Sequence, residues 1–215
     1  MRISLKDKPF EEIDFQAVLF DLDGTLVEST RLIGDILTQW AVEQDLDAEA
    51  VLLFSHGKRT QDIVAHFISD NSFELHYQTL TKKFLEASIH TKSIEAAASF
   101  IQALDDRRIP WAVVSSSERE LIYARMNAAG LPKPTQIVAA EDIIKGKPDP
   151  EGYLKGANIL NVPIERCLVF EDSPSGIQAV KAAGAQLIII GKSKLGLSII
   201  KNFAEMKFVL EDLSF

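Results

Sequence analysis

Short apolar runs recur along the chain at the length of buried strands. Each is rich in aliphatic and aromatic side chains and is bounded by polar or turn-forming residues, as the strands of a buried parallel sheet are. Between the later runs, apolar residues repeat at helical spacing, so strands and helices alternate from about residue 93 onward. This alternation predicts an α/β fold with a central parallel sheet flanked by helices on both faces. The strand-like runs lie at 15–20, 111–114, 136–140, 167–170 and 186–190, and the helical patterns at 94–104, 121–128 and 177–183.

A different pattern interrupts this alternation over residues 30–91. Apolar side chains recur there every three or four positions, without a strand pattern, which predicts a small helical bundle with its own core. Because the bundle follows the first strand, we expect it to lie over the carboxyl end of that strand as a cap domain. The core domain is then predicted to comprise residues 1–29 and 92–215, and hinges are expected near 27–30 and 92–93. The cap helices are predicted over 32–41, 63–68 and 73–84.

Composition narrows the classes of function. The 215 residues carry a net charge of −8, which argues against a protein that binds nucleic acid. The sequence contains no apolar run approaching about 18 residues, so no membrane span is expected. The first dozen residues are too charged for a targeting signal, and their role stays open between disorder and packing on the core. The single cysteine, Cys167, is expected to be a buried strand residue, and we expect a cytoplasmic protein.

Two aspartates, Asp21 and Asp23, follow the first strand in the segment DLDGT. Side chains two residues apart in an extended chain point the same way, and ligands of open α/β sheets bind beyond the carboxyl ends of the strands. Carboxylates about 5 Å apart repel each other by on the order of 3 kcal/mol at an effective dielectric of about 20. A hard divalent cation such as Mg²⁺ would relieve this repulsion. Further acids, Glu171 and Asp172, end a later strand.

Phosphate-binding groups follow two other strand-like or loop segments. Ser115 and Ser116 lie between a strand and a helix, where hydroxyls and amide N–H groups can hold phosphate oxygens. Lys147 lies in the loop segment GKPDP. Each segment alone could be a turn, a helix cap or a solvated loop. Together, at the ends of successive apolar runs, they favour a phosphoryl-transfer site, where charge stabilisation does most of the chemistry.

These motifs identify the chain as a member of the haloacid dehalogenase superfamily of phosphatases. They read DLDGT, VVSSS, GKPDP and VFEDSPSGIQAVKAAG, and the resemblance covers nearly the whole chain from about residue 15. It is to the branch with a Rossmann-like core and a helical cap inserted after the first strand. The resemblance implies that Asp21 is the nucleophile and forms an aspartyl-phosphate. It also implies that Asp23 first protonates the leaving oxygen and then deprotonates the attacking water.

The resemblance extends to the metal and the phosphoryl group. Mg²⁺ would be held by Asp21, the backbone carbonyl of Asp23 and Asp172. Lys147 and Ser115 would bind the phosphoryl group, and Glu171 would support Lys147 and the metal's water ligands. Because dehalogenases lack an aspartate at the position of Asp23, dehalogenation is not expected.

The cap is expected to select the substrate. Its segment HGKR, comprising His56, Gly57, Lys58 and Arg59, resembles a loop of bacterial sugar phosphatases and of glycerol-phosphate and deoxyglucose-phosphate phosphatases. The two cations could contact an anionic or hydroxylated substrate. Read alone, the segment is a solvated loop, and His56 could equally pack in the cap core. The expected function is a Mg²⁺-dependent phosphatase acting, as a monomer, on a small sugar or polyol phosphate.

Two alternatives remain beside this function. The superfamily also contains β-phosphoglucomutase, which carries a histidine in its first cap helix. The corresponding residue here is Ile33, which cannot exchange a proton, so the sequence favours hydrolysis over a mutase reaction without excluding the latter. A non-catalytic binding protein on this fold would be expected to lack one of Asp21, Asp23, Lys147 and Asp172, and all four are present.

Overall fold

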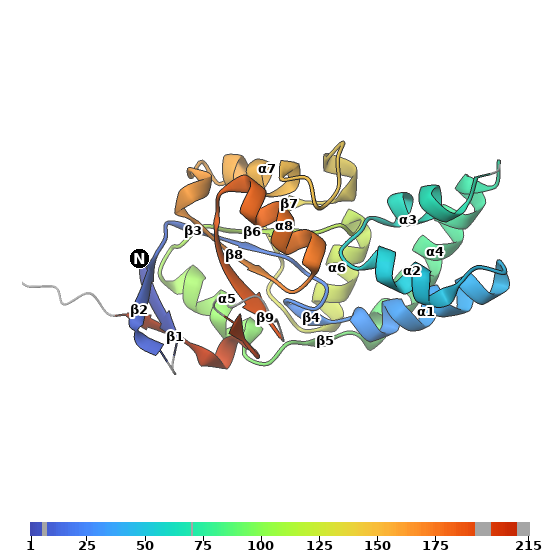
Figure 1. Ribbon diagram of the computed structural model, residues 1–215. Helices are drawn as coiled ribbons and strands as arrows, with labels where there is room; N and C mark the ends of the chain where they lie inside the picture. The colour runs from blue at the N-terminus through green and yellow to red at the C-terminus, as the bar shows by residue number, and fades with distance from the viewer. Residues whose placement is uncertain (6–7, 70, 192–198, 210–215) are drawn as a thin grey trace, which may run out of the picture.

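The computed structural model describes residues 1–5, 8–69, 71–191 and 199–209, and its centre is a parallel sheet (Figure 1). The strand order is β10-β9-β8-β3-β6-β7, and all neighbouring strands pair in parallel. This confirms the α/β class. Its strands are β3 (Ala17–Phe20), β6 (Trp111–Val114), β7 (Ile137–Val138), β8 (Cys167–Glu171), β9 (Gln186–Ile190) and β10 (Ile199–Ile200).

Alternate side chains of β3 build two separate apolar layers. Val18 and Phe20 point into a layer shared with α5 and α6, whereas Ala17 and Leu19 point into a layer shared with α7 and α8. All four side chains are fully buried, and the ring of Phe20 stacks on Phe170 with centroids 5.4 Å apart. Burying one large apolar side chain contributes roughly 1.5–3 kcal/mol. The helices are α5 (Ala97–Asp106), α6 (Arg119–Ala128), α7 (Glu151–Ile159) and α8 (Pro174–Ala183).

One predicted strand is shorter in the structure, and one helix has no counterpart among the sequence predictions. The strand expected over 136–140 is limited to β7, because Asp142 Oδ2 accepts the Ala139 N–H and starts the 3₁₀ turn η2 (Ala140–Asp142). Helix α7 was not predicted. Cys167 is buried in β8 as expected, and burial raises the pKa of its thiol to about 11.

The first residues form an antiparallel sheet that was not predicted. Strands β1 (Arg2–Leu5) and β2 (Lys8–Asp14) pair with each other, and β1 also pairs with β11 (Met206–Val209) near the other end of the chain. Ile3 is fully buried and belongs to the apolar layer of α5 and α6. The opening residues therefore pack on the core. Two short 3₁₀ turns precede later strands: η3 (Ile164–Arg166) precedes β8, and η4 (Phe203–Glu205) precedes β11.

Four helices between β4 (Val27–Glu28) and β5 (Lys92–Ser93) lie at the end of the molecule opposite the small N-terminal sheet (Figure 1). Their apolar cluster contains Trp40, Val64 and Leu80, and also Leu121 of α6. The division into core and cap at residues 30 and 91 stays a prediction. Among the described helices none is long and apolar enough to cross a membrane. The inserted helices are α1 (Thr30–Glu43), α2 (Ala48–Ser55), α3 (Thr60–Phe67) and α4 (Phe73–Ala87), which leads into the turn η1 (Ser88–His90).

Helix α2 was not predicted. Its apolar residues follow one another in the segment AVLLF instead of recurring at helical spacing. Its start carries a sequence signal nonetheless, since the Asp47 carboxylate caps the helix by accepting the N–H groups of Glu49 and Ala50. The two chain passages to these helices, β4 (Val27–Glu28) and β5 (Lys92–Ser93), pair with each other as a short antiparallel ribbon.

Candidate active site

A cavity of about 240 Å³ lies between the carboxyl ends of the central strands and the inserted helices. Asp21, Ser115 and Asp172 each follow directly on a parallel strand, so the sheet brings them to the same edge. The cap side contributes mostly apolar and small hydroxyl side chains. The core residues lining the cavity include Asp21, Asp23, Ser115, Ser116, Ser117, Asp172 and Ser173, and the cap residues include Thr30, Ile33, Leu52, Ser55, Thr60 and Phe84.

Lys147 joins two buried carboxylates at the floor of the site. Its Nζ donates to Asp21 Oδ1 at 2.5 Å and to Glu171 Oε1 at 2.7 Å. Burial lowers the pKa of Lys147, but the two carboxylates outweigh this effect and raise it well above its usual value, so the amine is charged. Glu171 also accepts a hydrogen bond from the Tyr153 hydroxyl at 3.2 Å and one from the Ser173 N–H at 2.6 Å. This network fixes the direction from which the ammonium approaches Asp21.

Three acids at this edge fit a divalent cation. Asp21, Glu171 and Asp172 each offer one carboxylate oxygen, and these oxygens lie within 4.8 Å of one another. Burial raises the pKa of Asp21 well above its usual value, and Lys147 opposes this only in part. Burial raises the pKa of Asp172 as well. Hard divalent cations prefer oxygen ligands such as carboxylates. A bound cation would also supply the positive charge that these carboxylates lack.

Gly24 lets the chain approach this acidic cluster closely. Its φ is +90°, and a Cβ there would overlap the Asp172 carboxylate. A larger residue would therefore be strained and would push the carboxylate away. His56 lies beside the same acidic cluster, with its Nε2 3.5 Å from Asp172 Oδ2. This interaction raises the pKa of His56, although burial alone would lower it.

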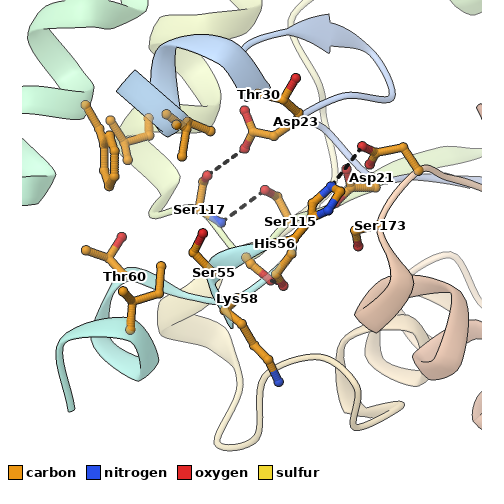
Figure 2. A pocket seen from close by; sticks show the side chains of 18 of the residues that line it. Asp21, Asp23, Thr30, Ser55, His56, Lys58, Thr60, Ser115, Ser117 and Ser173 are labelled. Atoms are coloured by element: carbon orange, nitrogen blue, oxygen red, sulfur yellow. Dashed lines mark hydrogen bonds and ion pairs between the residues drawn. The ribbon is translucent and has the colours of Figure 1, made fainter. Parts of the chain in front are cut away.

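Asp23 is turned toward a separate set of donors. Ser29 Oγ donates to its Oδ1. Ser117 Oγ donates to its Oδ2 at 2.8 Å (Figure 2). Arg125 Nη1 donates to the same Oδ2 at 2.7 Å. Sequence reasoning did not identify Ser29, Ser117 or Arg125 as site residues. The sequence nonetheless contains an indication that Arg125 has a specific role, because it is a charged residue among the apolar positions of α6.

The two predicted phosphate-binding serines differ in their contacts. Ser115 is buried on the cavity wall, and its Oγ accepts the Ser117 N–H at 3.1 Å (Figure 2). Ser116 also lines the cavity, but its Oγ donates to the carbonyl of Gly57 at 2.8 Å. Ser116 thus connects the core to the cap loop.

The predicted cap loop lies against the core. His56, Gly57 and Lys58 line the cavity, but Lys58 points away from Asp21 and Asp23 (Figure 2), and its Nζ donates to the carbonyl of Lys147 at 2.9 Å. The carbonyl of His56 accepts a hydrogen bond from Ser175 Oγ at 2.8 Å.

Arg59 is not among the cavity-lining residues of the described chain. It is buried, its Nε and Nη2 each donate to the Asp62 carboxylate at 2.8 Å, and its Nη1 donates to the carbonyl of Ile143 at 3.0 Å. Its guanidinium therefore joins the cap to a loop of the core. This contact could not be distinguished from a substrate contact in the sequence, because either role uses a basic residue on the same loop.

Comparison with known proteins agrees with this architecture. Hexitol phosphatase A of Escherichia coli is 37% identical over 176 residues, which cover 80% of this chain and 81% of that protein. Glycerol-1-phosphate phosphohydrolase 2 of Saccharomyces cerevisiae is 34% identical over 198 residues, which cover 86% of this chain and 78% of that protein. A solved hydrolase from Pseudomonas syringae has a TM-score of 0.80 at 20% identity, covering 88% of this chain and 95% of that one, and shares the fold.

The family model described as haloacid dehalogenase-like hydrolase matches residues 18–190. The match runs from the first central strand, through the inserted helices, to the end of β9. It therefore contains both the strand ends and the loops that surround the cavity. The chain belongs to the haloacid dehalogenase-like hydrolase family.

Proposed function

We propose that this chain is a Mg²⁺-dependent phosphatase that hydrolyses a small sugar or polyol phosphate through an aspartyl-phosphate on Asp21. The observation that carries the proposal is the environment of Asp21. Its carboxylate faces the cavity with the Lys147 ammonium 2.5 Å away, and Ser115 and Asp23 line the same wall. A carboxylate nucleophile beside phosphate-binding donors suits transfer of a phosphoryl group.

In the first step, one Asp21 oxygen attacks phosphorus and the bond from phosphorus to the leaving oxygen breaks. The leaving oxygen takes the electron pair of that bond and a proton from Asp23, so an alcohol departs. Lys147 and Ser115 hold the oxygens of the transferred phosphoryl group and stabilise the charge that it carries. The product is an acyl phosphate on Asp21.

In the second step, water attacks the phosphorus of the acyl phosphate. Asp23, which is now ionised, accepts the proton of the water, and the bond from phosphorus to the Asp21 oxygen breaks. Inorganic phosphate leaves, and both aspartates return to their starting forms. The cap excludes bulk water during the first step, and we propose that it opens by bending near 27–30 and 92–93.

Mg²⁺ would be held by Asp21 and Asp172, with the backbone carbonyl of Asp23 as a third ligand and Glu171 supporting its water ligands. When bound, it supplies positive charge that offsets the carboxylates and the phosphoryl oxygens. The fit rests on the cluster of two buried carboxylates and one partly buried carboxylate and on the raised pKa values of Asp21 and Asp172.

The proposed substrate class rests on the cavity and on the relatives. The volume of about 240 Å³ is below the roughly 300–1,000 Å³ of pockets for drug-sized ligands. Two relatives are named for hexitol and glycerol phosphates. His56, Gly57 and Lys58 are proposed to contact the substrate, and Ser116 to contact its phosphate. We also propose that the protein acts as a monomer. Its single cysteine is buried and unpaired, which supports our proposal of a reducing compartment such as the cytoplasm.

A mutase reaction is the second candidate, and Ile33 weighs against it. Ile33 lines the cavity from α1, so the side chain at the position matching the mutase histidine faces the site without a group that exchanges a proton. Hydrolysis needs no such group in the cap. The proposed reaction is therefore hydrolysis.

The test is phosphate release from a panel of hexitol, hexose, glycerol and nucleotide phosphates, with and without Mg²⁺. β-Glucose 1-phosphate is included and assayed for glucose 6-phosphate. Mg²⁺-dependent release from the polyol or sugar phosphates, lost in Asp21→Asn, is the expected result. Glucose 6-phosphate with little free phosphate would make the protein a mutase. Binding of substrates without turnover would make it a non-catalytic binding protein.

A further inference from the structure

Arg125 is a buried charge that the proposed reaction does not yet use. It lies on α6 beside the apolar residues Leu121, Ile122 and Met126, and its side chain is 3% exposed. An arginine stays charged in proteins, and a buried charge is costly unless it is paired. The contacts of Arg125 therefore indicate what the charge is for.

These contacts converge on one oxygen of Asp23. Arg125 Nη1 donates to Asp23 Oδ2 at 2.7 Å and to Ser117 Oγ at 2.8 Å, and Ser117 Oγ donates to the same Oδ2 at 2.8 Å. The guanidinium carbon lies 6.0 Å from the centre of the Phe84 ring on α4. Arg125 thus reaches the carboxylate from a core helix while a cap residue packs over it.

The two oxygens of Asp23 are not equivalent in this arrangement. Two N–H or O–H donors point at Oδ2, so a proton on Oδ2 would meet the Arg125 guanidinium directly. Oδ1 is hydrogen-bonded to the hydroxyl of Ser29. A hydroxyl can donate to a carboxylate oxygen and can also accept from a protonated one. The contacts therefore distinguish Oδ1 as the oxygen that is not held by the Arg125 guanidinium.

We propose that Arg125 is a positioning residue, which with Ser117 holds Asp23 so that Oδ1 delivers the proton to the leaving oxygen. This inference rests on the proposed phosphatase function and extends it to Arg125, which lines the cavity beside Asp23. Its consequence depends on the leaving group. An alkoxide from a sugar or polyol phosphate needs the proton, whereas 4-nitrophenolate leaves without one.

The experiment compares kcat/KM for a hexitol 6-phosphate and glycerol 1-phosphate with kcat/KM for 4-nitrophenyl phosphate. This constant reports the steps up to departure of the leaving group and is insensitive to the later attack by water. Arg125→Met keeps the volume and removes the donors. It should lower kcat/KM for the polyol phosphates roughly 10²-fold, the lower range for general acid catalysis, and change the value for the aryl phosphate far less.

Three further variants complete the test. Arg125→Lys should restore part of the polyol activity, because an ammonium can still donate to Oδ2. Ser117→Ala removes the other donor without removing a buried charge, and it should show the same selective loss. Arg119→Gln is the matched control on the same helix, because Arg119 pairs with Asp142 and does not line the cavity. It should leave both activities unchanged.

Equal losses on the alkyl and aryl phosphates, or no loss on either, would overturn the inference while the phosphatase function stands. If Arg125→Met fails to fold by circular dichroism, Arg125→Lys and Ser117→Ala decide the question in the same way. A wild-type protein that releases no phosphate from any ester would instead overturn the proposed function, and the inference with it.

Discussion

Gly176 offers a sharp test of the buried network under the site. It lies in the first turn of α8, and a Cβ there would overlap Oε1 of Glu171 and lie 2.6 Å from Oε2. The Glu171 side chain cannot rotate away freely, because it is fully buried. It also accepts hydrogen bonds from Lys147, Tyr153 and Ser173. Gly176→Ala must therefore displace the carboxylate from some of these donors.

The expected loss of stability follows from those bonds. A hydrogen bond to a charged group contributes roughly 1.5–3 kcal/mol, so giving up two of them costs roughly 3–6 kcal/mol. The better helix propensity of alanine offsets about 1 kcal/mol of this loss. The free energy of unfolding should fall by roughly 2–5 kcal/mol. Phosphatase activity should fall too, because Lys147 loses one of the carboxylates that orient it.

Gly34→Ala is the matched control. Gly34 also lies inside a helix, α1, but a Cβ there would meet Leu52 Cδ2 at 3.7 Å, an ordinary contact. The same substitution should therefore raise the free energy of unfolding by about 1 kcal/mol. Urea melts followed by circular dichroism would compare both variants with the wild type. A Gly176→Ala protein as stable as the wild type would show that Glu171 is not held as described.

Other changes have equally definite outcomes. Lys58→Ala should raise KM several-fold for a polyol phosphate but not for 4-nitrophenyl phosphate; equal effects would remove Lys58 from substrate recognition. Arg59→Ala loses the hydrogen bonds of the guanidinium to Asp62 and to the carbonyl of Ile143, each worth roughly 1.5–3 kcal/mol. Urea melts should therefore show a lower free energy of unfolding. An unchanged melt would show that these contacts do not hold the loop. Burial raises the pKa of Glu118 in the folded chain. At a pH between the usual pKa and this raised pKa, the folded chain keeps a proton on Glu118 that the unfolded chain has lost. The free energy of unfolding should therefore fall as pH rises from about 4.3 through the raised pKa. Glu118→Gln should make this slope shallower, while the part that belongs to Asp21 and Asp172, whose pKa values burial also raises, remains. An unchanged slope would contradict the raised pKa of Glu118. Chelation of Mg²⁺ with EDTA should abolish phosphate release and added Mg²⁺ should restore it; release that survives chelation would contradict the metal requirement.

The central part of the fold was predictable from the sequence for a physical reason. Parallel strands buried on both faces need continuous apolar runs, and their carboxyl ends meet at one edge. The polar residues that follow those runs, Asp21, Ser115 and Asp172, therefore had to come together, and they line one cavity. Their chemical roles stay predictions until activity is measured.

The rest depends on contacts between distant segments. β1 pairs with β11 near the opposite end of the chain, and neither strand has a local signal as strong as the central runs. Arg59 stands beside Lys58 on one loop, yet its Nη1 donates to the carbonyl of Ile143, a residue distant in the sequence. Arg125 meets Asp23 only when α6 packs beside β3. The i,i+3 spacing of Arg59 and Asp62 is a local signal for their ion pair, but no spacing along the sequence indicates the contacts of Arg59 with Ile143 or of Arg125 with Asp23.

The most direct test of the central claim is the stereochemistry at phosphorus. A polyol phosphorothioate, made chiral at phosphorus with sulfur and one heavy oxygen isotope, is hydrolysed in water labelled with a second heavy oxygen isotope, and the configuration of the released inorganic thiophosphate is determined. Two in-line displacements, first by Asp21 and then by water, predict net retention. Net inversion would mean that water attacks the substrate directly, and it would contradict the aspartyl-phosphate on Asp21.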